Sequence, residues 1–134
     1  MAKAWVRAKG TQISPHGEES IELTTEAELY KNRGNYYIVY RSSPDTITTL
    51  KIERDRVVVY NSGRHNSKLV FEKDKKNVSP YVTSDGIFDL GVIGKKMHID
   101  IGSTGGEVNL KYHLELNNRY VSTNELKLTV REVN

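Results

Sequence analysis

The sequence predicts an all-β protein folded as a single antiparallel meander β-barrel of about eight to ten strands. Runs rich in Val, Ile, Tyr and Thr are short, and turn residues such as Gly, Asn and Asp separate them at regular intervals. The stretch VNLKYHLEL, residues 108–116, is apolar at every second position, which places its apolar side chains on one face of a strand. A chain of 134 residues is long enough for one buried core, so we expect one domain spanning residues 1–134.

The first element with a clear pattern lies in residues 20–34. From Ile21 to Leu29 the odd positions are mostly apolar, and the even positions are glutamate or threonine. Residues 25–33 also fit a short helix, because Thr25 and Glu28 have the spacing of a capping box. Alternation over this length favours one long strand, and the short helix is the alternative.

The middle of the chain contains several further strand candidates, each bounded by turn residues. These runs are rich in β-branched and tyrosine residues, which are typical of strands. Glycine, asparagine and aspartate between them supply the positive φ angles that tight hairpins need. The expected strands are NYYIVYRS (35–42), TITTLKIE (46–53), RVVVY (56–60), KLVFE (68–72) and KMHIDI (96–101).

Two hairpins are expected in the last third of the chain. If STGG, residues 103–106, forms the first turn, Met97 faces Tyr112 with both side chains on the inner face. The second turn is expected at NNR, residues 117–119, where a three-residue loop often carries a bulge and the register stays open. The favoured pairing sets Tyr112 opposite Asn124 and places polar groups inside the barrel near one end.

The chain as a whole resembles the uncharacterised bacterial proteins of the DUF1934 family, which look like lipocalin-like or calycin-like β-barrels. The resemblance covers nearly the full length and implies the fold, but it brings no established activity and no functional residue. The segments that carry it are TEAELYKNRGNYYIVY, TTLKIE, SKLVFE followed by YVTSDGIFDLGV, and KYHLELN followed by NELKLTV.

The interior of such a barrel is the candidate binding site. A barrel of about eight strands is wide enough either to be filled by side chains or to hold one small ligand. Eight tyrosines against two phenylalanines give this interior an unusual number of hydroxyl groups. One interpretation is a mostly apolar pocket with a few converging polar groups; the other is that the tyrosines fill the barrel and hydrogen-bond internally. The candidate ligand-binding residues are Tyr36, Tyr40, Thr48, Tyr81, Tyr112 and Asn124.

No pattern in the sequence predicts catalysis, a metal site or a cofactor. His98 and His113 come near Asp100 on a polar face, but a convincing metal site needs three or four converging ligands and the neighbouring lysines oppose a cation. The stretch GVIGKK, residues 91–96, lacks the spacing of a phosphate-binding loop and leads into a strand. We therefore expect no catalytic residues, no metal, no cofactor and no enzymatic activity.

The charge and the composition limit the classes of partner that the protein is expected to bind. The formal net charge of +3 is mild, and acidic residues interrupt the basic ones, so nucleic-acid binding is disfavoured. The alternative to a small ligand is a protein-interaction or single-stranded nucleic-acid-binding module that uses outer basic turns. Its candidate residues are Arg54, Arg56, Arg64, Lys68, Lys73, Lys75 and Lys76.

The sequence also bears on location and assembly. It contains no cysteine and no apolar segment of the length that a signal peptide or a membrane span needs. We expect a cytoplasmic protein that does not contact membranes. Apolar residues on the outer faces, such as Ile87, are compatible with a monomer or with a homodimer, and this choice stays open.

Overall fold

The computed structural model describes residues 2–63 and 66–133. Over these residues the chain forms ten β-strands and no helix, and therefore no helix long and apolar enough to cross a membrane. The strands are β1 (Ala2–Ser14), β2 (Gly17–Asn32), β3 (Asn35–Ser43), β4 (Thr46–Ile52), β5 (Val57–Gly63), β6 (Ser67–Phe71), β7 (Lys76–Thr83), β8 (Gly86–Gly102), β9 (Gly105–Leu116) and β10 (Arg119–Glu132).

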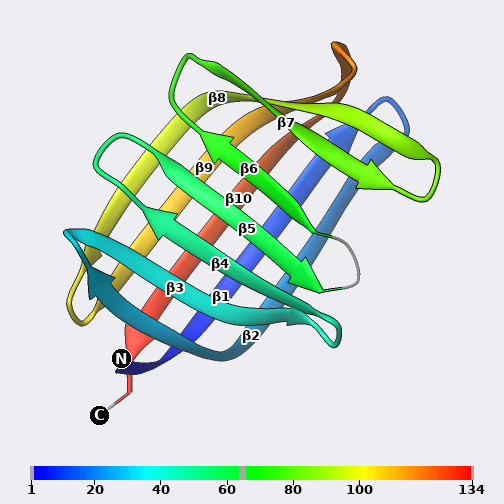
Figure 1. Ribbon diagram of the computed structural model, residues 1–134. Helices are drawn as coiled ribbons and strands as arrows, with labels where there is room; N and C mark the ends of the chain where they lie inside the picture. Colours follow the sequence, from blue (N-terminus) through cyan, green and yellow to red (C-terminus); the bar gives the residue numbers. More distant parts are fainter. Residues whose placement is uncertain (1, 64–65, 134) are drawn as a thin grey trace.

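The ten strands form one sheet that curls into a nearly closed barrel. The sheet order is β6-β5-β4-β3-β2-β1-β10-β9-β8-β7, so the first strand pairs with the last and all ladders are antiparallel. In Figure 1, β3 to β6 cross in front of β8, β9, β10 and β1. The two ends of the sheet approach each other where the backbone N–H of Asp74 donates to the Gly94 carbonyl oxygen at 2.8 Å. The predicted meander barrel is confirmed.

Residues 25–32 belong to a strand, as the alternation predicted, and only Arg33 of the segment 25–33 lies in the turn. Residues 17–32 form β2, and Arg33 and Gly34 make the following turn with φ angles of 52° and 86°. Ala27 and Leu29 are buried, whereas the glutamates between them are exposed. Burial of one face of the strand therefore outweighs the local capping-box signal.

The register of the β8–β9 hairpin differs from the prediction by two residues. Met97 faces Leu110 instead of Tyr112. The predicted turn comprised residues 103–106, but only Ser103 and Thr104 form the turn, and Gly105 already lies in β9 with a φ of 133°. A shift of two residues keeps each side chain on the same face of the sheet, so the inward-facing set was predicted correctly although its pairs were wrong.

The β9–β10 hairpin has the expected bulge but a shorter turn. Asn117 and Asn118 form a two-residue turn, both with positive φ, and the register shifts between Tyr120 and Ser122. After this bulge Asn124 lies opposite Tyr112, as predicted.

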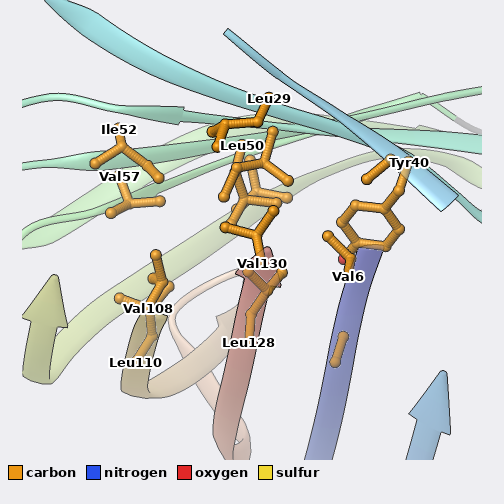
Figure 2. Packing of buried hydrophobic residues seen from close by; sticks show 14 of the residues in the cluster. Val6, Leu29, Tyr40, Leu50, Ile52, Val57, Val108, Leu110, Leu128 and Val130 are labelled. Atoms are coloured by element: carbon orange, nitrogen blue, oxygen red, sulfur yellow. The ribbon is translucent and has the colours of Figure 1, made fainter. Parts of the chain in front are cut away.

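The core fills the barrel between its front and back strands. Figure 2 shows Leu50 of β4 above Leu128 of β10, and Tyr40 of β3 above Val6 of β1. Val6, Leu50 and Leu128 are fully buried. The inward-facing apolar residues of these strands thus form one packed core.

Candidate functional site

The inward-facing polar residues gather at one end of the barrel, which we call the polar end. Because the strands alternate in direction, the turns at residues 15–16, 44–45, 84–85 and 117–118 all lie at this end. The polar side chains that are most deeply buried among the described residues belong to strand segments near these turns, namely Thr48, Ser122 and Asn124. At the opposite end the inward residues are apolar, among them Ile52, Val57 and Val108.

Part of the polar end is a hydrogen-bonded ladder across β3 to β6. The Thr48 hydroxyl oxygen lies 2.7 Å from Ser42 Oγ and donates to Asn61 Oδ1 at 2.7 Å. Asn61 Nδ2 then donates to Ser67 Oγ at 3.0 Å. Thr48 was predicted to bind a ligand, but its hydroxyl is already satisfied within the protein, which is the usual state of buried polar groups.

Tyr112 and Asn124 lie opposite each other on β9 and β10 and line a pocket of about 230 Å³. We call Tyr112, Asn124 and Leu126 its floor, because Tyr112 and Leu126 pack against the core and Asn124 is buried. The wall is the far part of the β1–β2 hairpin, whose outermost residues are exposed. The further lining residues are Gly10, Thr11, Gln12, Glu19, Ile21 and Glu125.

The floor of the pocket offers one hydrogen-bond donor and one acceptor. Burial raises the pKa of Tyr112 to about 12, and no hydrogen bond to a described residue contributes to this shift. The hydroxyl is therefore neutral and free to donate. Asn124 Nδ2 donates to Ser122 Oγ at 3.0 Å, which leaves the carboxamide oxygen of Asn124 as an acceptor. The Phe71 ring packs edge-on against Tyr112 with centroids 4.7 Å apart, and this contact holds the phenol in place.

The other three predicted residues lie outside this pocket. Tyr40 is buried, burial raises its pKa to about 12, and its side chain lies over Val6 (Figure 2). Tyr36 is close to the turn at the opposite end, where the ammonium of Lys31 lies 5.4 Å from its ring centroid. Tyr81 is half-buried on β7, opposite Phe88. Of the six predicted residues, the structure brings two together in the pocket.

The residues that prediction missed are on the β1–β2 hairpin. Gly10 pairs with Ile21 and with Leu126, so all three share the inward face. A Cβ at Gly10 would meet no atom within 4 Å, which shows open space beside this backbone. The alternation that begins at Ile21 was the one sequence pattern that could have predicted these residues. Ile21 is 74% exposed and is not part of the packed core, so this pattern did not mark a binding site.

The outer basic turns are largely neutralised by neighbouring acids. Arg56 pairs with Glu53, and Lys75 pairs with Glu72. Lys76 pairs with Glu115. Arg64 lies outside the described residues. The turns therefore do not form one continuous basic surface.

The histidines of the polar face do not converge. His98 Nε2 lies 3.0 Å from Glu107 Oε1, and His113 packs edge-on against Tyr120. In the part of the chain that the structure describes, no three His, Asp or Glu residues form a group able to hold a metal.

Comparison with known proteins identifies a family but no activity. A family model described as a domain of unknown function, DUF1934, matches residues 6–128. Among solved structures, the chain is similar to the crystal structure of the ywiB protein from Bacillus subtilis, with 18% sequence identity and a TM-score of 0.87. The likeness covers 99% of this chain and 93% of that one, and at this identity it shows the fold alone. No curated protein matches the chain.

Proposed function

We propose a ligand-binding function for this chain, which belongs to the DUF1934 family. The ligand is a small, partly apolar molecule held in the barrel interior at the polar end, in the manner of a lipocalin-like barrel. The observation that carries the proposal is the pairing of Tyr112 and Asn124 beneath a pocket of about 230 Å³. Small-molecule sites usually contain a few polar groups that fix the orientation of the ligand.

The chemistry of the floor narrows the ligand class. A neutral phenol that donates and a carboxamide oxygen that accepts match a ligand with an acceptor and a donor side by side, such as an amide. Leu126 and Ile21 supply apolar contact for the rest of the molecule. A pocket of about 230 Å³ limits the ligand to roughly the size of one ring with a polar substituent.

The Tyr112 hydroxyl also remains available to a guest, because burial is the one cause that shifts its pKa. The members of the Thr48 ladder at the same end bond to one another and offer less to a ligand.

Benzamide is a suitable probe, because it combines an aromatic ring with an amide. We expect benzamide to shift the NMR signals of the Asn124 side-chain amide in the wild-type protein. Gly10→Val places a branched side chain in the pocket, and its Cβ has no atom of the fold within 4 Å. We expect this variant to fold normally and to lose the shift.

The matched control is Gly102→Val, which makes the same change at the opposite end of the barrel. A Cβ at Gly102 lies 3.9 Å from its nearest neighbour, an ordinary contact. The control should bind benzamide like the wild type. Retention of the benzamide shift in Gly10→Val would place binding elsewhere and refute the pocket.

The compartment is a separate proposal. We propose that the protein acts in the cytoplasm of bacterial cells, where a chain without cysteine suits the reducing conditions. Immunoblotting of fractionated cells checks this, and recovery in a membrane or secreted fraction would contradict it.

A further inference from the structure

Five lysines surround a concave area on the outside of β8, β9 and β10, which we call the lysine face. The concavity has a volume of about 640 Å³, and Glu125 is the one acidic residue among those that line it. The whole chain has a formal net charge of +3. The residues that line this concavity include five lysines and one glutamate, so this surface is more basic than the chain as a whole. The lysines are Lys73, Lys95, Lys96, Lys111 and Lys127.

Two of the lysines repel each other within the folded protein. Lys96 lies directly opposite Lys111 in the β8–β9 ladder, and like charges in such a pair are destabilising. Among the described residues, none of the five lysines forms an ion pair. An anionic partner would remove this repulsion.

A β-bulge holds the lysines in place. The register of β8 shifts between Gly94 and Lys96, and the extra residue is Lys95, so two consecutive lysines are exposed. The Gly94 N–H donates to the Lys75 carbonyl oxygen at 3.2 Å. A backbone bridge between Lys73 and Gly94 places Lys73 beside the bulge. Bulges often re-aim side chains next to functional sites.

Aromatic side chains continue the lysine face along the same strands. His113 follows Lys111 by two residues on β9 and therefore points to the same side of the sheet. Its ring packs edge-on against Tyr120 with centroids 5.7 Å apart, and Tyr120 is 50% exposed. Exposed rings beside a positively charged groove are the features that single-stranded nucleic acids require.

We propose that the lysine face binds single-stranded nucleic acid without sequence preference. The lysines contact the phosphates as point charges, and Tyr120 with His113 offers a surface on which bases stack. The surface is the outer side of the sheet, so this function is independent of the interior pocket. It also differs from the outer basic turns, which share only Lys73 with it.

The test is fluorescence anisotropy of labelled oligothymidylate at increasing salt. For the double variant Lys96→Ala/Lys111→Ala we expect a loss of affinity of about tenfold or more at low salt, and a salt slope lower by about 1.4 because two phosphate contacts disappear. The melting temperature should not fall, since the variant removes a repulsive pair. Tyr120→Ala should weaken binding roughly tenfold through lost stacking.

The matched control is Lys3→Ala/Lys31→Ala, which removes the same charge from two exposed residues away from the lysine face. This control should bind like the wild type. An absence of binding at low salt, or equal losses in the two double variants, would overturn the proposal. Competition by inorganic polyphosphate as effective as competition by the oligonucleotide would overturn the assignment to nucleic acid.

Discussion

At the scale of single residues, hydrogen bonding separates the functional candidates from the structural ones. Thr48 and Tyr112 are both inward-facing residues with hydroxyl groups, and both were candidates from the sequence. The Thr48 hydroxyl is used by Ser42 and Asn61, whereas burial alone acts on the Tyr112 hydroxyl. A hydroxyl beside a pocket that no neighbouring side chain uses is the stronger indication of a binding site, because it can donate to a ligand.

The two buried tyrosines make stability depend on alkaline pH. Burial raises the pKa of Tyr40 and of Tyr112 from 10.0 to about 12. Between these values the unfolded chain has lost the protons that the folded chain keeps, so the free energy of unfolding falls as pH rises from 10 towards 12. The loss is up to roughly 1.4 kcal/mol per pH unit for each group.

Urea denaturation between pH 9 and 12 measures this dependence. We expect Tyr112→Phe to show a shallower fall than the wild type, because one of the two late-ionising groups is gone. An identical slope in Tyr112→Phe would contradict the burial of this hydroxyl.

At the scale of elements, the bulge in β8 connects the closure of the barrel to the lysine face. Gly94 lies where the two ends of the sheet meet, and a Cβ there would collide with the carbonyl oxygen of Glu72. We expect Gly94→Ala to destabilise the protein by about 1–3 kcal/mol, since the backbone of residues 72–75 has to move. Urea denaturation measures the effect.

Gly102→Ala is the control for this change. It lies in the same strand, and a Cβ there makes only an ordinary contact at 3.9 Å from Gly105 O. We expect a change below about 0.5 kcal/mol. Equal destabilisation by the two variants would show that the contact between Gly94 and Glu72 does not matter.

The strands were predicted correctly where the burial of one face fixes the register. The β8–β9 turn was predicted at the wrong residues because glycines were assigned to it. Alternation correctly predicted a strand over residues 25–32, and it correctly paired Tyr112 with Asn124. Gly105 and Gly106 suggested a turn, but both lie in β9. The wall of the pocket was missed because the far part of the β1–β2 hairpin is exposed on both faces, so no hydrophobic contrast marks its inward side.

At the scale of the whole molecule, the barrel separates an apolar end from a polar end. The apolar end is packed and supplies stability, and the polar end combines a satisfied ladder with a pocket that has free hydrogen-bonding groups. The sequence predicted the barrel and the polar groups near one end. It did not predict which polar groups bond to one another, because the ladder joins residues from four strands.

Native mass spectrometry of the protein purified from its own cells tests the proposed ligand binding most directly. We predict a mass excess that disappears on denaturation and gives the size of the bound molecule. The excess should be absent from Gly10→Val and present in Gly102→Val. A bare mass for the wild type, or an excess that survives in Gly10→Val, would contradict a ligand in the polar-end pocket.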